Sequence, residues 1–303
     1  MEKKRLNEIL GIRYPIIQGG MANIATGEFA AVCSEAGALG RIGSGGIRSA
    51  EELRRQIHIL RERTKKPFGV NLMLMNPETE KMVDIVCEEK VPVVTTGAGN
   101  PGAYMERFKA AGILVIPVVA APILAKHLER IGADAVIAEG CESGGHIGEM
   151  TTMTLIPQTV DAVDIPVIAA GGIADHRQMQ AVLTLGACGA QIGTALLAAE
   201  ECPIHENYKE AVLKAQGSDT IVTGRIGGTP VRVLKNQMSR EYVKREKAGE
   251  DRMELEKFTL GSLRRAVFEG DTKNGSLMAG QSCGQLKEIR PVAEILAEIC
   301  RGI

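Results

Sequence analysis

Short apolar runs alternate with helix-like segments along much of the chain, and this alternation is the feature that most restricts its fold. Eight runs are expected to be strands, at residues 14–20, 38–43, 67–74, 92–96, 114–119, 135–138, 166–170 and 190–192. The first and last begin near positions 14 and 190, so seven steps give roughly 25 residues each, a normal strand–helix unit. Continuous apolar strands are typical of parallel sheets that are buried on both faces.

Helices are expected between these strands, at residues 27–36, 49–63, 77–89, 101–111, 122–131, 154–163, 175–185 and 194–199. Ser49 followed by Glu52 three residues later predicts a capping box at the start of one of them. Eight strand–helix units indicate the α/β class and favour a (β/α)8 TIM barrel. An open doubly wound sheet remains the alternative fold.

The pattern changes after residue 203. Residues 204–248 are charged and have a helical pattern, interrupted by a glycine-rich segment at 224–230, and residues 250–269 continue it. We therefore expect three parts: the barrel over residues 1–202, a smaller helical excursion after strand eight over 203–274, and a return segment over 275–303. The final helix of that segment, at residues 291–300, is expected to pack on the barrel.

Charge and cysteine usage exclude several classes of protein. The formal net charge is -1, which gives no indication of nucleic-acid binding. The seven cysteines include no Cys-x-x-Cys pair, so neither a disulfide framework nor a zinc or iron–sulfur site is indicated. No apolar run is long enough for a membrane span, and no apolar signal segment follows the charged residues 1–5. A cytoplasmic protein is expected.

Glycine-rich segments follow most of the predicted strands. Active sites of TIM barrels lie at the C-terminal ends of the strands. No cluster of metal ligands occurs there. Glycine-rich loops contact a ligand through backbone atoms, which suits a large flat ligand better than a metal ion. Phosphate groups in such barrels are commonly held by the loops after strands seven and eight, which here contain Gly171 and Gly172, and Gly193 and Thr194.

The loop after the sixth strand carries a histidine. The run from Ala138 to Gly148 reads Ala-Glu-Gly-Cys-Glu-Ser-Gly-Gly-His-Ile-Gly. An imidazole at a strand end is well placed for proton transfer near neutral pH, so His146 is the candidate catalytic residue. The other four histidines lie in or beside helical patterns. Cys141 is in the same loop, but its acidic neighbours oppose thiolate formation.

One motif gives a competing interpretation. Residues 97–102 read Gly-Ala-Gly-Asn-Pro-Gly, which matches the dinucleotide fingerprint G-x-G-x-x-G between a strand and a helix. That fingerprint requires an acidic residue roughly 20 positions further on. The next strand ends at Val119 and is followed by Ala-Ala-Pro, so the acid is missing and a Rossmann site is disfavoured.

Several motifs together resemble enoyl-acyl carrier protein reductase II, within the nitronate monooxygenase-like flavoproteins. They are Gln18-Gly19-Gly20-Met21-Ala22, Pro67-Phe68-Gly69-Val70-Asn71, Thr95-Thr96-Gly97-Ala98-Gly99-Asn100-Pro101, Glu139-Gly140, Gly144-Gly145-His146-Ile147-Gly148, Ala169-Ala170-Gly171-Gly172-Ile173-Ala174-Asp175 and Met278-Ala279-Gly280-Gln281. The match covers nearly the whole chain. The combination is highly specific, whereas each motif alone is not.

The resemblance implies non-covalent FMN, reduced by NADH or NADPH, which then reduces the double bond of an enoyl thioester on acyl carrier protein. It implies flavin contacts from Gly19, Gly20, Met21, Ala22, Asn71, Glu139, Gln191, Met278, Ala279, Gly280 and Gln281, and phosphate contacts from Gly171, Gly172, Gly193 and Thr194. His146 would be the catalytic histidine, acting as proton donor or as a partner for the thioester oxygen. Monomer and homodimer both remain open.

Three positions depart from the usual family pattern. Asn23 replaces an aromatic residue, Arg41 replaces the first isoleucine of Gly-Leu-Gly-Ile-Ile, and Ala195 replaces the arginine of Gly-Thr-Arg-Phe. An arginine beside a phosphate loop is a good bidentate partner, which alanine cannot replace. These departures keep two other functions open: a nitronate-oxidising monooxygenase, and a divergent flavoprotein with a regulatory or partner-binding role.

A carrier protein is acidic, so the reductase function predicts a basic docking patch. The candidates are Lys235, Arg240, Lys244, Arg245, Arg264 and Arg265. A solvated helical face explains the same residues equally well.

Overall fold

Eight parallel strands form a closed barrel in the computed structural model, which describes residues 4–227 and 229–303. The strands are β1 (Ile16–Gln18), β2 (Gly40–Gly43), β3 (Phe68–Met73), β4 (Val93–Gly97), β5 (Leu114–Val119), β6 (Val136–Glu139), β8 (Val167–Ala170) and β9 (Gly189–Ile192). Their order in the sheet is β1-β9-β8-β6-β5-β4-β3-β2. A bridge between Ile17 and Leu39 joins β1 to β2 and closes the ring. The TIM barrel is confirmed, and the open sheet is wrong.

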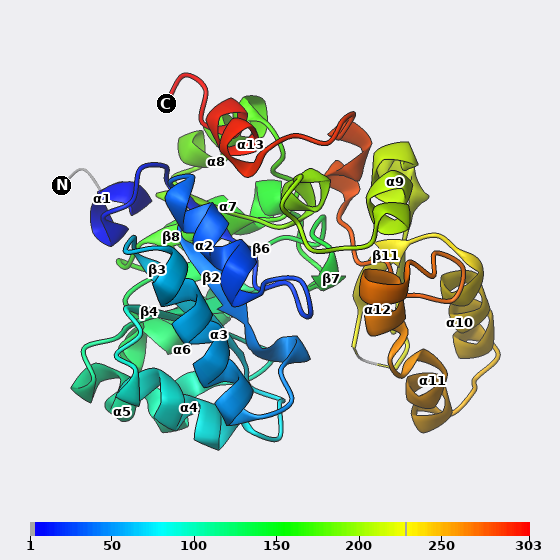
Figure 1. Cartoon of the computed structure of the whole chain (residues 1–303), viewed down its shortest axis with the longest axis horizontal. Helices are drawn as coiled ribbons and strands as arrows, with labels where there is room; N and C mark the ends of the chain where they lie inside the picture. Colours follow the sequence, from blue (N-terminus) through cyan, green and yellow to red (C-terminus); the bar gives the residue numbers. More distant parts are fainter. Residues whose placement is uncertain (1–3, 228) are drawn as a thin grey trace.

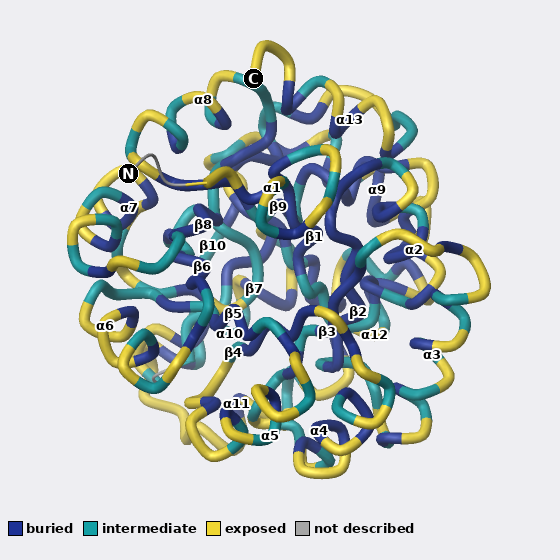
Figure 2. The backbone as a smooth tube through the Cα atoms, turned by 90° about the vertical axis from the view of Figure 1, so that its left-hand side faces the viewer, coloured by how far each residue is buried: buried dark blue, intermediate teal, exposed yellow. Residues whose placement is uncertain are grey.

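Helices surround the strands as a ring, which Figure 2 shows end-on with buried strands inside exposed helices. They are α2 (Gly27–Glu35), α3 (Ala50–Arg63), α4 (Thr79–Glu88), α5 (Met105–Ala110), α6 (Pro122–Arg130), α7 (Thr152–Val160) and α8 (His176–Thr184). Ser49 caps α3 by accepting from Glu52 N at 3.2 Å. The Glu52 carboxylate accepts from Arg48 N instead of Ser49 N, so half of the predicted capping box forms. Residues 194–198 form a 3-10 helix, η3, where an α-helix was expected.

The interior of the barrel is apolar towards the N-terminal ends of the strands. Leu39, Val93 and Ile137 are buried there in one cluster with neighbouring side chains. Helix α1 (Leu6–Leu10), which the sequence pattern did not predict, adds Leu6 and Leu10 to this cluster. The N-terminal end is thereby filled, and ligand contact is left to the other end of the strands.

The excursion lies beside one end of the barrel, at the right of Figure 1. It contains α9 (Glu206–Lys214), β10 (Thr220–Thr223), β11 (Val231–Leu234), α10 (Gln237–Lys247), α11 (Arg252–Thr259), α12 (Ser262–Arg264) and the π-helical turn η5 (Arg265–Glu269). The expectation of helix through residues 204–248 is wrong for β10 and β11. Both are short and rich in β-branched residues, which favour strands. Residue 228 of the predicted interruption lies outside the described residues.

A three-stranded sheet of β10, β11 and a segment of the barrel joins the two parts of the chain. Strands β10 and β11 are antiparallel to each other, and β11 also pairs with β7 (Gly145–His146), which belongs to the loop after β6. The small sheet therefore joins the excursion to the C-terminal end of the barrel.

The return segment runs back from the excursion to the barrel. Tyr208 Oη donates to Met278 O at 2.8 Å, and the chain continues through the 3-10 helix η6 (Gln281–Gln285) to α13 (Val292–Ile299). Helix α13 contacts α2 and α8 and buries Val292 and Leu296. Within the described part of the chain, no helix is both long and apolar enough to cross a membrane.

Candidate active site at the mouth of the barrel

Three strand ends meet so closely that glycine is required at one of them. A Cβ atom on Gly20, after β1, would lie 2.5 Å from Asn71 Cγ on β3. Gly19 N donates to Ile192 O at 2.7 Å, and a Cβ atom on Gly193 would lie 3.7 Å from Met21 Sδ. The loops after β1 and β9 and the end of β3 therefore form one continuous surface. Ala22 extends it towards the loop after β2, 3.0 Å from where a Cβ atom on Gly45 would lie.

The return segment completes the other side of the mouth. Gly280 N donates to Thr194 Oγ1, after β9, and Gln281 N donates to Glu142 O, after β6; both distances are 2.9 Å. Ala279 lies so close to Gly144 that a Cβ atom there would be 2.7 Å from the Ala279 carbonyl carbon. Residues 278–281 are thus brought to the mouth from the far end of the sequence.

The two loops predicted to hold phosphate follow neighbouring strands, β8 and β9. Gly171 and Gly172 have φ angles of 96° and 76°, a region that favours glycine. Thr152 Oγ1 lies 2.9 Å from Gly171 O and from the Glu142 carboxylate, two acceptors that share its single proton. Glu142 also accepts from Thr152 N at 3.0 Å, so its negative charge stabilises the N-terminus of α7.

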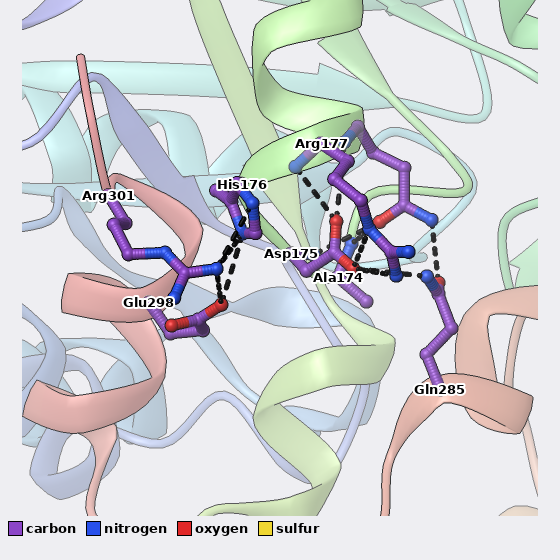
Figure 3. Close-up of polar contacts among 8 residues, drawn as sticks. Ala174, Asp175, His176, Arg177, Gln285, Glu298 and Arg301 are labelled. Atoms are coloured by element: carbon purple, nitrogen blue, oxygen red, sulfur yellow. Dashed lines mark hydrogen bonds and ion pairs between the residues drawn. The ribbon is translucent and has the colours of Figure 1, made fainter.

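The loop after β8 is fastened to the C-terminal part of the chain, as Figure 3 shows. Asp175 caps α8 by accepting from Arg177 N at 2.9 Å, and Gln178 Nε2 donates to Gln285 Oε1 at 2.7 Å. His176 Nδ1 lies 3.1 Å from Glu298 Oε1 on α13. The loop that carries Gly171 and Gly172 is therefore held on its outer side by η6 and α13.

A layer of polar side chains lies directly above the apolar filling of the barrel. Arg41, Thr95 and Glu139 each come two residues after a member of that filling, and side chains alternate along a strand. Arg41 Nη1 donates to Thr95 Oγ1 at 2.5 Å and Nη2 donates to Gln191 Oε1 at 2.6 Å. Thr95 Oγ1 donates in turn to Asn71 Oδ1 at 2.9 Å. The layer links four strands through Arg41. From the sequence, Arg41 could be identified only as a charged residue beside the second strand.

Burial shifts the pKa of both charged groups in this layer, and each charge opposes the shift of the other. Burial lowers the pKa of Arg41 to about 9, and the Glu139 carboxylate opposes that shift. Burial raises the pKa of Glu139 to about 7, and the Ser143 hydroxyl and then Arg41 oppose that shift. Arg41 therefore stays charged at neutral pH, whereas Glu139 is close to half ionised.

His146 is held at the rim of the mouth by backbone pairing. It lies opposite Val231 in the small sheet, and Ile147 N donates to Pro230 O at 3.1 Å. The residue is exposed, and partial desolvation by the surrounding loops lowers the pKa of its imidazole. His146 is therefore neutral at physiological pH.

Two features of this loop concern the residues beside His146. Burial, followed by the neighbouring Glu142, raises the pKa of the Cys141 thiol, which fits the expectation that Cys141 is not a nucleophile. The buried Arg232 donates through Nε and Nη2 to Cys141 O at 3.0 and 2.7 Å. Neither β11 nor Arg232 was identified from the sequence, although the β-branched runs on either side of a glycine-rich turn are a hairpin signal.

Comparison with known proteins identifies the family. The family model described as nitronate monooxygenase matches residues 3–83 and 78–302. The chain belongs to the nitronate monooxygenase family. This confirms the resemblance inferred from the sequence, and members of this family are flavoenzymes.

Individual relatives carry several names. The structure of FabK from Thermotoga maritima has a TM-score of 0.95 and 50% sequence identity, and the match covers 99% of this chain and 95% of that one. A probable nitronate monooxygenase of Staphylococcus saprophyticus is 34% identical over 92% of this chain and 91% of its own. A (3aS,4S,5R,7aS)-5-hydroxy-7a-methyl-1-oxo-octahydro-1H-indene-4-carboxyl-CoA dehydrogenase of Rhodococcus jostii is 36% identical over 77% of this chain and 66% of its own.

The residues at the mouth fit a flavin. Gly20 has no side chain, so its backbone lies against Asn71 without the clash that a Cβ atom would cause, and the polar layer below offers donors to a ring with many acceptors. Arg41 Nε is buried and has no hydrogen-bond partner among residues 4–227 and 229–303. In the same described ranges, no group of three or more His, Cys, Asp or Glu could hold a metal ion.

Proposed function

We propose that this chain is an FMN-dependent reductase of the double bond in enoyl thioesters carried by acyl carrier protein, the final reductive step of fatty acid elongation. NADH or NADPH would be the reductant. One observation carries the proposal: the segments that the sequence resemblance assigns to the flavin, from β1, β3, β6, β8, β9 and the return segment, converge at one mouth with His146 at its rim. The likeness to FabK over 99% of this chain supports the same function.

The flavin ring would lie on residues 19–22, with Asn71, Glu139 and Gln191 below it and residues 278–281 at its side. Its phosphate would be bound by backbone N–H groups at Gly171, Gly172 and Gly193, with the Thr194 hydroxyl. Bound FMN would supply the hydride chemistry that protein side chains lack. The closely packed glycines keep the ligand near the backbone.

His146 would act on the substrate. Negative charge develops on the thioester oxygen when hydride adds to the β-carbon, so a donor near that oxygen lowers the barrier. A neutral imidazole carries one N–H donor and one acceptor nitrogen. Because the pKa of His146 is lowered, we favour the role of hydrogen-bond donor to the thioester oxygen over that of a charged acid.

Docking of the acidic carrier would use the exposed basic side chains of α10. Arg245 is less suitable than the sequence suggested, since its Nε lies 2.9 Å from Glu241 Oε1 and its guanidinium packs on the Phe258 ring. Lys244 is 80% exposed and its Nζ lies 4.0 Å from Glu241 Oε2, a longer contact than that of Arg245. Arg240 is exposed on the same helix. These two residues remain the better candidates.

A nitronate monooxygenase is the second candidate, because the family model and the Staphylococcus relative carry that name. In that reaction His146 would accept a proton from the substrate carbon, and oxygen would reoxidise the flavin. Little nicotinamide would be consumed.

Anaerobic titration separates the two functions. NADH and then NADPH are added to the purified protein while the visible flavin absorption is followed. Loss of the band, restored by an enoyl thioester, supports the reductase. A flavin that neither nucleotide reduces, with oxygen uptake on an alkyl nitronate, supports the monooxygenase. A protein that binds FMN but shows neither activity contradicts both functions and favours the regulatory or partner-binding role.

A further inference from the structure

We propose that Arg41 tunes the flavin: it makes the amides of Asn71 and Gln191 present N–H donors towards the flavin ring, and it places beneath that ring a positive charge that favours the reduced, negatively charged form. This inference rests on the proposed FMN site. It concerns a residue at which this chain departs from the usual pattern of its family, where isoleucine is expected.

The first step concerns the position of the charge. Arg41 is 1% exposed and lies in the polar layer between the apolar filling and the mouth. Its two terminal nitrogens contact β4 and β9, on either side of the ring of strands. The charge is therefore held inside the barrel, where little water screens it and its field reaches a ligand above.

The second step concerns the direction of the hydrogen bonds. A guanidinium has donors and no acceptor, so the Gln191 group that faces it must be the carbonyl oxygen. The Gln191 amino group is then left to point elsewhere as a donor. Thr95 Oγ1 accepts from Arg41 and donates to Asn71 Oδ1, which likewise leaves Nδ2 of Asn71 as the free donor. Arg41 thus sets the donor character of both amides.

The third step concerns how far Glu139 neutralises the positive charge of Arg41. Glu139 is the acidic group that acts on Arg41 across the barrel, and its own carboxyl is incompletely ionised at neutral pH. The floor of the mouth therefore carries a net positive charge with donors above it. Positive charge and donors near a flavin stabilise its reduced form over its oxidised form.

Two variants separate the two parts of the inference. Arg41→Ile removes the charge and introduces the residue usual in the family, so the barrel should accept it. Thr95→Val keeps the charge but breaks the link to Asn71. For each variant we would measure the midpoint potential of the bound flavin by dye-coupled reduction and the dissociation constant of FMN by fluorescence quenching. Thermal unfolding checks the fold, and Arg41→Ile with Glu139→Gln replaces the single variant if that one does not fold.

In Arg41→Ile the preference for reduced over oxidised flavin should fall about tenfold, which for a two-electron couple is a potential about 30 mV more negative. In Thr95→Val the FMN dissociation constant should rise severalfold, with a smaller change in potential. An unchanged potential in Arg41→Ile would overturn the role of the charge. Unchanged FMN affinity in Thr95→Val would overturn the link to Asn71.

The wild-type protein distinguishes this inference from the proposed function. A wild-type protein that binds no FMN contradicts both. A wild-type protein that binds FMN and is reduced by NAD(P)H, together with variants identical to it in potential and affinity, contradicts the inference about Arg41 alone.

Discussion

Arg232 donates two hydrogen bonds to the carbonyl oxygen of Cys141, and this contact fixes the loop that carries His146 to the strand beside it. Arg232→Met should remove both bonds, together with the one from Nη1 to Thr220 Oγ1 at 2.9 Å, and leave the half-buried Cys141 carbonyl without this donor, which costs about 1–3 kcal/mol of stability. We expect a lower kcat and a His146 pKa, measured by NMR, that returns towards its ordinary value as the loop loosens. Arg225→Met on the same hairpin removes only an exposed pair with Glu149 and should change neither. Equal effects of the two variants would contradict the positioning role.

His146→Ala should keep the fold and the bound FMN but lower kcat on an enoyl thioester by roughly 10²–10⁴, the usual contribution of a proton-transfer or donor group. Flavin content is read from the visible spectrum and turnover from NAD(P)H oxidation. The matched control is His127→Ala, an exposed histidine on α6 outside the mouth. Full turnover in the His146 variant would remove its catalytic assignment.

Glu139 predicts a pH dependence of stability. Its pKa is about 7 in the folded protein against an ordinary value of 4.5, so the folded state binds the proton more tightly. The resulting stabilisation is present below pH 4.5 and is lost as the pH rises through 7. Glu139→Gln should remove this dependence and be more stable than wild type at pH 8.5 by about 1–2 kcal/mol, allowing for partial solvent screening. Urea unfolding at pH 5.5 and 8.5 measures both proteins, and parallel pH curves would show that Glu139 titrates normally.

Gly20→Ala should weaken FMN binding at least tenfold, because its Cβ atom would overlap the Asn71 side chain. Gly97→Ala is the control at another strand end, since a Cβ atom there would meet nothing within 4 Å. FMN affinity of both variants is measured by fluorescence quenching. A comparable loss of FMN affinity in both variants would mean that the backbone freedom of these glycines matters, and not the close contact between Gly20 and Asn71.

Reversal of charge on α10 tests the docking of the carrier. Arg240→Glu with Lys244→Glu should raise KM for the carrier-bound enoyl substrate about tenfold and leave a free thioester unaffected. Lys65→Glu with Lys66→Glu, between α3 and β3, makes the same change in charge at the opposite end of the barrel and should have little effect. A similar rise in KM for both substrates would contradict the proposed docking of the carrier on α10.

The barrel could be predicted because its strands are locally encoded. Residues 114–119 are one apolar run, and β5 has the same bounds. The positions of most candidate site residues at the mouth could be predicted as well, because these residues come directly after the strands in the sequence. The strands β10 and β11 could not, because each has only four residues, and β11 also pairs with β7, far away in the sequence.

Arg41 shows another limit of local reasoning. A charged residue within a short apolar strand looks unfavourable when its neighbours alone are considered. Its partners Thr95 and Gln191 lie 54 and 150 residues away, and only the closure of the barrel brings them within hydrogen-bond distance. The sequence therefore indicated Arg41 as an unusual residue but not the network that accommodates it.

The strand that carries His146 belongs to two parts of the molecule at once. It leaves the barrel after β6, yet its backbone pairs with β11 of the excursion. A shift of the excursion would therefore carry the imidazole with it, while the glycines of the proposed flavin site stay with the barrel. Arrival of a carrier on α10 and alignment of the reacting groups would then be mechanically coupled, so that an empty enzyme and a loaded one need not hold the histidine at the same distance.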